Sequence, residues 1–203
     1  MSTYLELKRK IAKHLMRSSI GLPKTKDLSA LYRKYEANSL EAESSATLDI
    51  GCGNAPRNPF GAAELFGIDV FENSEKGIRK ADLAIEPIPF ANDTFDFLTA
   101  YDFLEHVPRV VYLPERRLPF VELMNEIWRV LKPKGIFFSC TPAYPFPPVF
   151  QDPTHVNFLT EETFPLYFDD QHRWGAMYGF TGSFRILEQY INGQSLISVL
   201  QKA

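Results

Sequence analysis

The sequence lacks the features that mark disulfide-rich and membrane-spanning proteins. Its 203 residues include only two cysteines, Cys52 and Cys140, and neither has a partner at a spacing typical of a metal site or a disulfide framework. No apolar run reaches the roughly 20 residues that a membrane span needs, and no signal-peptide pattern opens the chain. We therefore expect a cytoplasmic enzyme, with residues 1–203 forming a single domain large enough to bury a core.

An overall excess of positive charge is also absent. The formal net charge is −3, so no electrostatic argument favours nucleic acid as a partner. Lysine and arginine are nevertheless concentrated in residues 1–26, where Glu6 is the only acid. Apolar residues recur there at helical spacing: Tyr4, Leu7, Ile11 and Leu15. This pattern predicts a basic amphipathic helix that either covers the sheet or the active site, or contacts an anionic partner such as a membrane surface.

The most informative pattern joins two short apolar runs. The first ends at Asp49 and passes into Gly51-Cys52-Gly53, and the second ends at Asp69. This is typical of a strand–loop–strand unit that binds a nucleotide, because the glycines allow close backbone approach and the second acid can bind two ribose hydroxyls. A dinucleotide site is disfavoured, because Pro56 replaces the third glycine of its fingerprint and Asp49 would repel a pyrophosphate.

Beside a ligand that carries positive charge, the carboxylate of Asp49 is favourable. The segments Thr47-Leu48-Asp49-Ile50-Gly51-Cys52-Gly53 and Phe66-Gly67-Ile68-Asp69 resemble motif I and the following acid of the class I S-adenosylmethionine-dependent methyltransferases. The resemblance covers roughly residues 45–142 and implies that S-adenosylmethionine, with its sulfonium and ammonium groups, is the cofactor. It implies cofactor contacts at Asp49, Gly51, Cys52, Gly53, Asp69, Val70, Asp82, Leu83, Ala100 and Tyr101.

Two pairs of these residues are assigned to particular parts of the cofactor. Asp82 and Leu83 follow the third predicted strand, where the family binds adenine. A carboxylate followed by a free backbone N–H is complementary to the donor and acceptor on the adenine edge. Ala100 and Tyr101 end the fourth strand, where the family holds the methionine end of the cofactor.

The predicted elements alternate between strand and helix. Strands are expected near 46–50, 65–70, 78–83, 95–100 and 135–141, a long helix at 118–131, a short helix after Thr160, and a β-hairpin at 184–190 and 195–200. Because Pro56 and Pro59 occupy the loop after the first strand, the helix expected there must be short, within Gly61–Leu65.

The expected fold class is α/β. Its sheet is Rossmann-like, doubly wound and seven-stranded, mostly parallel with one antiparallel strand near the C-terminus. The strand order is implied by the family resemblance alone. Within the single domain, residues 1–45 are expected to form an N-terminal helical cap, and residues 142–183 a substrate-side insertion.

The loop after Gly53 leads to a separate hypothesis about Arg57. Its two prolines remove N–H donors that could hold the cofactor carboxylate, and Arg57 could replace them with a charge-assisted contact. After the fifth strand the chain reads Thr141-Pro142-Ala143, without the oxygen ligands of the metal-dependent catechol type, so we expect no metal.

The expected reaction is methyl transfer to a small-molecule acceptor, such as a hydroxyl of a sugar or another metabolite. His155 is the first candidate for the general base, with Asp152 to orient it, and His106 is the second, because histidine exchanges a proton near neutral pH. Two alternatives stay open. One is a catalytically silent module that binds the cofactor or regulates a partner, and the other is an NAD-type oxidoreductase. The sequence does not predict an oligomeric state.

Overall fold

A computed structural model of the chain describes residues 2–18, 20–25, 27–36, 42–112 and 114–203. The helices and short 3-10 turns are α1 Ser2–Ser18, α2 Ser29–Tyr35, η1 Ala42–Ser44, η2 Ser74–Lys76, η3 Leu104–His106, α3 Pro119–Val130, α4 Pro148–Gln151, α5 Thr163–Tyr167 and η4 Trp174–Tyr178. The strands are β1 Ala46–Ile50, β2 Glu64–Asp69, β3 Ile78–Lys80, β4 Phe95–Tyr101, β5 Val111–Tyr112, β6 Arg116–Arg117, β7 Leu131–Pro142, β8 Phe184–Asn192 and β9 Ser195–Lys202. Parts of the expected cap at 1–45, residues 37–41 among them, lie outside the described residues.

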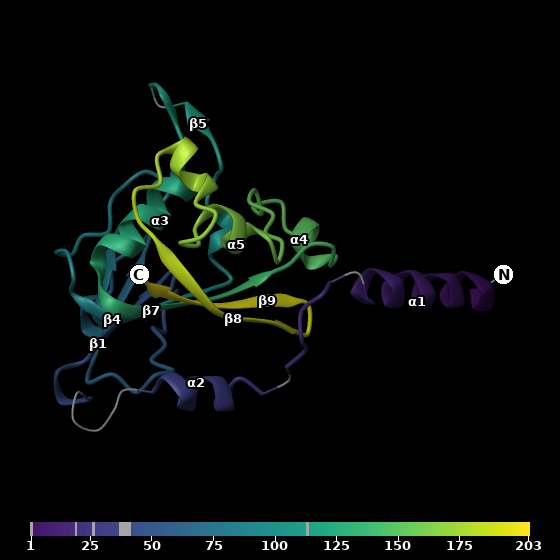
Figure 1. Ribbon diagram of the computed structural model, residues 1–203, viewed down its shortest axis with the longest axis horizontal. Helices are drawn as coiled ribbons and strands as arrows, with labels where there is room; N and C mark the ends of the chain where they lie inside the picture. The colour runs from purple at the N-terminus through teal and green to yellow at the C-terminus, as the bar shows by residue number, and fades with distance from the viewer. Residues whose placement is uncertain (1, 19, 26, 37–41, 113) are drawn as a thin grey trace.

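One seven-stranded sheet organises the molecule (Figure 1). Its strand order is β3-β2-β1-β4-β7-β9-β8, and the pairs from β3 to β7 are parallel. β9 runs antiparallel to both of its neighbours, so it is the single reversed strand. The predicted fold class is therefore confirmed, including the C-terminal hairpin. β5 and β6 form a separate two-stranded ribbon.

The connection between β1 and β2 differs from the prediction. The short helix expected within Gly61–Leu65 is wrong, because residues 51–63 form turns and β2 already begins at Glu64. The side chain of Asn58 binds both backbone groups of Ala62, with Oδ1 accepting from its N–H at 2.9 Å and Nδ2 donating to its carbonyl at 2.7 Å. Such a side-chain bridge competes with helical hydrogen bonds, and Gly61 has φ +66°, outside the helical region.

The loop still buries one face of the sheet. Phe60 is fully buried and stacks on Phe97 of β4 with ring centroids 4.8 Å apart. Its ring also meets Phe138 of β7 and Tyr32 of α2 edge-on. Figure 1 shows α2 lying along this face, where Leu31 enters the same apolar cluster. A loop phenylalanine and an N-terminal helix thus cover the surface that a helix after β1 would otherwise cover.

The opposite face carries the larger core. α3 begins with Pro119 and packs its apolar side against the sheet, with Leu123, Met124 and Ile127 fully buried. This confirms the helix predicted at 118–131, except that Leu131 already belongs to β7. α5 follows Thr160 as expected and buries Phe164 in the same core. The third strand is shorter than predicted: β3 ends at Lys80, and 81–86 form a turn in which the N–H groups of Ile85 and Glu86 both donate to the carbonyl of Asp82.

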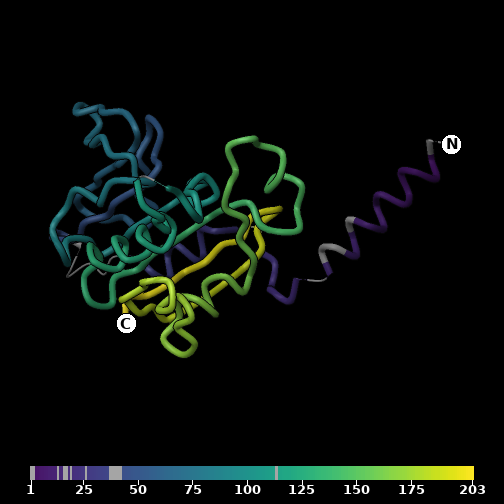
Figure 2. The backbone as a smooth tube through the Cα atoms, turned by 90° about the horizontal axis from the view of Figure 1, so that it is seen from above, coloured from purple at the N-terminus to yellow at the C-terminus, as the bar shows by residue number. Residues whose placement is uncertain are grey.

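The first helix stands apart from the rest of the chain. Figures 1 and 2 both show α1 projecting away from the body, from the end on which α4 lies. The chain rejoins the body at residues 20–25, where Ile20 is buried and the N–H of Thr25 donates to the carbonyl of Ile191. Among the described residues, no helix is both long and apolar enough to cross a bilayer.

The packing of Phe60 generates a stability prediction. Phe60→Ala should lower the free energy of unfolding by about 3–5 kcal/mol, because it removes a buried ring from a site that the short loop cannot refill. Urea denaturation followed by circular dichroism measures the change. The control is Phe71→Ala, which removes a 38% exposed ring and should cost less than about 1 kcal/mol. Equal losses in the two variants would contradict the assigned role of Phe60.

Candidate active site

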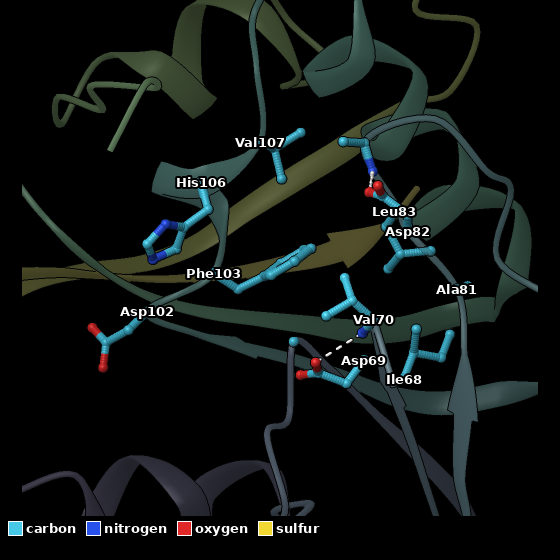
Figure 3. Close-up of a pocket in the computed structure, with 12 residues that line it drawn as sticks. Ile68, Asp69, Val70, Ala81, Asp82, Leu83, Asp102, Phe103, His106 and Val107 are labelled. Carbon is cyan, nitrogen blue, oxygen red and sulfur yellow. Dashed lines mark hydrogen bonds between the residues drawn. The ribbon is translucent and has the colours of Figure 1, made fainter. Parts of the chain in front are cut away.

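A cavity of about 320 Å³ opens at the carboxyl ends of the parallel strands. Its walls come from the turns that follow β1, β2, β3 and β4, which meet at one edge because these strands are parallel and adjacent. Figure 3 shows this cavity. The lining residues are Gly51, Ile68, Asp69, Val70, Ala81, Asp82, Leu83, Ala84, Asp102, Phe103, His106 and Val107.

Asp49 lies beneath the cavity and fastens the glycine loop. Its carboxylate is 1% exposed; Oδ1 accepts from the hydroxyl of Thr99 at 2.6 Å and Oδ2 accepts from the N–H of Arg57 at 2.9 Å. Burial raises the pKa of Asp49 to about 6, and the hydrogen bonds from Thr99 and Arg57 work against that rise. Since both oxygens hold protein groups and the residue does not line the cavity, Asp49 could influence a ligand in the cavity only through its charge and through the loop that it holds.

The two glycines of the loop are required by different features. Gly51 has φ +64°, and a Cβ atom there would lie 2.3 Å from the ring of Phe103, so only glycine fits. Gly53 has φ +57°, and its N–H donates to Oδ2 of Asp69 at 2.8 Å. Cys52 between them is partly buried against Gly67, and burial raises the pKa of its thiol to about 11. The thiol is therefore a packing group rather than a nucleophile.

Asp69 and Val70 form the wall that follows β2. Oδ1 of Asp69 accepts from the N–H of Val70 at 2.8 Å, while Oδ2 holds Gly53, so the carboxylate is fixed at the cavity edge (Figure 3). A carboxylate has about four acceptor positions, so two backbone bonds leave capacity for ligand hydroxyls. The side chain of Val70 is 61% exposed and offers an apolar surface beside it.

Asp82 and Leu83 form the opposite wall. Oδ1 of Asp82 accepts from the N–H of Ala84 at 3.0 Å, and the N–H of Asp82 donates to Glu86. Within the part of the chain that the structure describes, the N–H of Leu83 has no hydrogen-bond partner. A carboxylate followed by an unpaired donor on the cavity wall has the pattern that an adenine edge requires. The residues present therefore fit the adenosine part of S-adenosylmethionine.

The residues predicted to hold the methionine end of the cofactor are not the ones that line the cavity. Ala100 is buried within β4 and Tyr101 turns its ring toward the α2 face, so neither lines the cavity. The hydroxyl of Tyr101 lies 3.1 Å from that of Tyr32, and burial raises its pKa. Asp102 and Phe103 line the cavity instead. They belong to the Tyr-Asp-Phe-Leu-Glu-His segment. Strand periodicity alone does not predict that the lining residues follow the strand instead of ending it.

Arg57 stands at the outer side of the glycine loop. Its guanidinium carbon lies 4.3 Å from the ring centre of Tyr101, a cation–π arrangement. The side chain is exposed, and no salt bridge with an acid is found within the described residues. The structure thus holds a positive charge beside the loop without neutralising it.

The two candidate histidines come together. The rings of His106 and His155 are 4.8 Å apart in an edge-on arrangement, and His106 lines the cavity. Nδ1 of His155 lies 3.0 Å from the carbonyl of Pro148, and because a carbonyl only accepts, Nδ1 carries the proton and Nε2 the lone pair. The two loops are joined by Val156 and Asn157, whose N–H groups both donate to the carbonyl of Glu105.

Asp152 does not orient His155, contrary to the prediction. Its Oδ1 accepts from the hydroxyl of Thr154 at 2.6 Å, and that hydroxyl oxygen lies 3.0 Å from Nδ1 of His106. Because the Thr154 hydroxyl donates to Asp152, Nδ1 of His106 donates to Thr154, which leaves Nε2 of His106 with its lone pair. Asp152 therefore orients His106, since the Asp-Pro-Thr-His turn points Thr154 rather than His155 at the carboxylate.

Glu105 is a site residue that sequence reasoning did not single out. It is 1% exposed; Oε2 accepts from the hydroxyl of Thr141 at 2.6 Å, and Oε1 has no partner within the described residues. Burial raises its pKa. The only sequence signal is its position before His106 in the Leu-Glu-His segment.

A second cavity, of about 530 Å³, lies between residues 109–121 and the segment 158–178. Its lining is mostly apolar and aromatic, with Phe120, Phe158 and Tyr178 among the rings. The guanidinium of Arg109 at its edge donates to Asn157 at 2.7 Å and to the carbonyl of Phe158. The segment after β7 thus contributes much of a second concave surface, which Arg109 connects to the loop at Asn157 and Phe158.

Comparison with known proteins agrees with this geometry. The profile of the family described as "Methyltransferase domain" matches residues 48–139, from β1 to the middle of β7. No curated protein matches the sequence significantly.

Solved structures share the fold at low sequence identity. A SAM-dependent methyltransferase from Archaeoglobus fulgidus is 16% identical, with 86% of this chain and 93% of that chain covered and a TM-score of 0.53. The PH0226 protein from Pyrococcus horikoshii is 16% identical, with 87% and 88% covered and a TM-score of 0.55. The cyclase SpnF is 16% identical, with 86% and 79% covered and a TM-score of 0.55.

The family match and the cavity coincide. The matched residues contain the glycine loop, Asp69, Asp82 and the Leu-Glu-His segment, and every lining residue of the first cavity lies within the matched range. Residues 48–139 thus match the methyltransferase domain family, and this match, together with the shared fold of a SAM-dependent methyltransferase, implies S-adenosylmethionine as the cofactor.

Proposed function

We propose that the protein transfers the methyl group of S-adenosylmethionine to a hydroxyl of a small molecule. The observation that carries this proposal is the paired histidines at the edge of the cofactor cavity, each with Nδ1 bonded away and Nε2 carrying a lone pair. Two oriented proton acceptors beside a cofactor cavity are what methylation of a hydroxyl requires, since its oxygen must lose a proton.

We propose that residues at the cavity and in the glycine loop hold the cofactor. Asp69 accepts the ribose hydroxyls, Asp82 and the N–H of Leu83 bind the adenine edge, and Gly51 gives room beside Phe103. Buried Asp49 provides negative charge beneath the loop, and Arg57 contacts the cofactor carboxylate. When bound, S-adenosylmethionine supplies an activated methyl group.

The chain's own residues then have to align the acceptor and accept its proton. The electron pair of the acceptor oxygen forms the new bond to the methyl carbon, the pair of the methyl–sulfur bond returns to sulfur, and the hydroxyl proton leaves through the histidine pair. His155 takes the proton, as its Nδ1 is fixed on a backbone carbonyl, and His106 is held beside it by Thr154 and Asp152. Alignment accounts for most of the acceleration, because the methyl group is already activated.

The acceptor side is proposed to be the segment 142–183, as part of a single domain. This segment contributes His155 and most of the second cavity, whose aromatic walls and few polar groups suit the ring of a sugar or another hydroxylated metabolite. Two other functions use the same fold. A silent cofactor-binding module would need no acceptor beside the histidines, and an NAD-type oxidoreductase would need the third glycine that Pro56 replaces.

The proposed activity predicts a labelled product. Incubation with methyl-labelled S-adenosylmethionine and a panel of sugars and other polyols should give S-adenosylhomocysteine and a labelled acceptor, detected by mass spectrometry. His155→Ala should lower kcat by roughly 10²–10⁴ while S-adenosylhomocysteine binding stays within about threefold, since the base does not hold the cofactor. Tight S-adenosylhomocysteine binding without transfer to any acceptor would instead identify the silent module, and binding of NAD the oxidoreductase.

The exposed charge of Arg57 generates a second prediction. Arg57→Ala should weaken S-adenosylhomocysteine binding by roughly tenfold in calorimetry, because it removes a charge-assisted contact with the amino-acid carboxylate. The Michaelis constant of the acceptor should change far less. Both effects can be measured on the same preparation.

Arg79 offers a matched control for this experiment. Its guanidinium lies 4.1 Å from the ring centre of Phe90, much as Arg57 lies over Tyr101, but Arg79 belongs to β3 and donates to the carbonyl of Pro89, away from the glycine loop. Arg79→Ala should leave cofactor affinity unchanged. If the two variants lose affinity equally, or if neither does, Arg57 has no special contact with the cofactor.

A further inference from the structure

Three potential metal ligands converge at the edge of the cofactor cavity. A carboxylate oxygen of Glu105 and one ring nitrogen each of His106 and His155 lie within 4.8 Å of one another. The three side chains come from two loops: η3 after β4, and the turn that follows α4. Two imidazoles and one carboxylate form a mixed nitrogen and oxygen donor set that leaves other coordination positions open.

Each of the three side chains is held in place on its far side. Thr141 donates to Oε2 of Glu105, Nδ1 of His155 donates to the carbonyl of Pro148, and Nδ1 of His106 donates to Thr154. Bonds of this kind fix the tautomer and orientation of metal-binding histidines and carboxylates in known metal sites. Here they leave Oε1 of Glu105 and Nε2 of both histidines as the groups available to a ligand.

The carboxylate of Glu105 gives an independent indication that a ligand binds between the three side chains. The residue is 1% exposed, yet Oε1 has no hydrogen-bond partner within the described residues. A buried carboxylate oxygen without a partner is costly, so such an atom needs an explanation. A cation between Glu105 and the histidines would provide one.

We propose that Glu105, His106 and His155 bind one divalent transition-metal cation, which receives the hydroxyl of the methyl acceptor. The binding of the cation stands by itself, and only its role toward the acceptor rests on the proposed function. The sequence expectation of no metal considered oxygen ligands after β7. This set instead uses imidazole nitrogen, which favours zinc, iron, copper or nickel over magnesium. From separations of 4.8 Å, each ligand atom needs to move by less than about 1 Å to reach metal–nitrogen distances of ~2.0–2.1 Å.

The cation would change how the acceptor loses its proton. A cation lowers the pKa of a hydroxyl that it contacts, so the proton can pass to water near neutral pH. The oxygen keeps its electron pair for the bond to the methyl carbon, and the methyl–sulfur pair returns to sulfur. With the cation bound, the histidines act as its ligands in place of taking the proton themselves, and a hydroxylated acceptor with two neighbouring oxygens could fill two open positions.

Cobalt is a direct probe of this site. The full-length protein, stripped with EDTA, should bind one equivalent of Co²⁺ and develop visible absorption typical of mixed nitrogen and oxygen ligands. Glu105→Gln keeps the volume and the bond to Thr141 but weakens the ligand, and His155→Ala removes one; each should reduce Co²⁺ affinity by at least tenfold. His172→Ala is the matched control, because this exposed histidine lies outside the cluster, and it should bind Co²⁺ normally.

Measuring cofactor binding distinguishes a loss of folding from a loss of metal binding. S-adenosylhomocysteine affinity, measured on each variant, shows whether the protein is folded. A folded wild type that binds no Co²⁺, or binds it equally well without Glu105 and His155, overturns the site. Cobalt binding without methyl transfer would leave the site standing and remove the proposed function, whereas transfer at an unchanged rate after EDTA would leave the histidines as general bases.

The isolated helix α1 supports a second, independent inference. Its apolar residues Tyr4, Leu7, Ile11 and Leu15 share one face and are all more than half exposed, and Leu5 is exposed as well. Lys8, Arg9 and Lys10 are exposed on the same helix, and Lys8 lies over the ring of Tyr4 at 4.6 Å. Figures 1 and 2 show no part of the body against it.

We infer that α1 lies on an anionic lipid surface. An apolar face flanked by lysine and arginine matches the boundary between acyl chains and negatively charged headgroups. Nucleic acid would not bury the apolar residues, and a second copy of the helix would bring like charges together. α1 leaves the body beside α4, so the surface would lie near the proposed acceptor side.

Vesicle flotation tests this surface. The full-length protein should float with vesicles of phosphatidylglycerol and phosphatidylcholine, far less with phosphatidylcholine alone, and less at high salt. Lys8→Gln and Lys10→Gln should each weaken binding by roughly fivefold, and the double variant Leu7→Gln, Ile11→Gln by at least tenfold. Tyr112→Gln, a 72% exposed aromatic on the body, is the control. Absence of binding to the anionic vesicles, or a wild-type dimer that the α1 variants dissociate, overturns the inference.

Discussion

The buried carboxylate of Asp49 is the interaction on which the site depends. It lies at the end of β1 and accepts hydrogen bonds from Thr99 of β4 and from the N–H of Arg57 in the following loop. These bonds fix both sides of the glycine loop, which has no helix to hold it. The carboxylate is thereby removed from water, and this burial raises its pKa to about 6. A bound cation above the loop would favour the ionised form, so cofactor binding and ionisation of Asp49 support one another.

The sequence predicted the strands of the sheet better than the segments that pack on its faces. Strands β1, β2, β4 and β7 are short apolar runs bounded by turn residues, and their length and composition are local properties. The helix expected within Gly61–Leu65 was wrong because the outcome depends on distant contacts. Phe60 is buried only because Phe97, Phe138 and Tyr32 surround it, and no local pattern contains those residues.

The cofactor side was largely predictable for a geometric reason. In a parallel sheet the acids that end neighbouring strands must meet at one edge, so Asp69 and the turn at Asp82 and Leu83 follow from the strand assignments. The acceptor side was not. His106 and His155 were separate candidates, and they meet because Val156 and Asn157 bond to the carbonyl of Glu105. Backbone pairing between two loops has no sequence signature, which is also why Asp152 was assigned to the wrong histidine.

The acids of the site fall into two groups, one for each positive charge that the site is proposed to bind. A sulfonium cofactor and a bound divalent cation repel one another. If the same acids held both, the two positive charges would lie close together, and the repulsion would be strong in a partly buried site. The chain separates them: Asp49 and Asp69 hold the loop side of the cavity, while Glu105 lies with the histidines. Figure 3 shows Phe103 between His106 on one side and Asp69 and Val70 on the other. Gly51 has to be glycine because Phe103 fills that space, so the residue that fixes the loop sequence also separates the two charged regions.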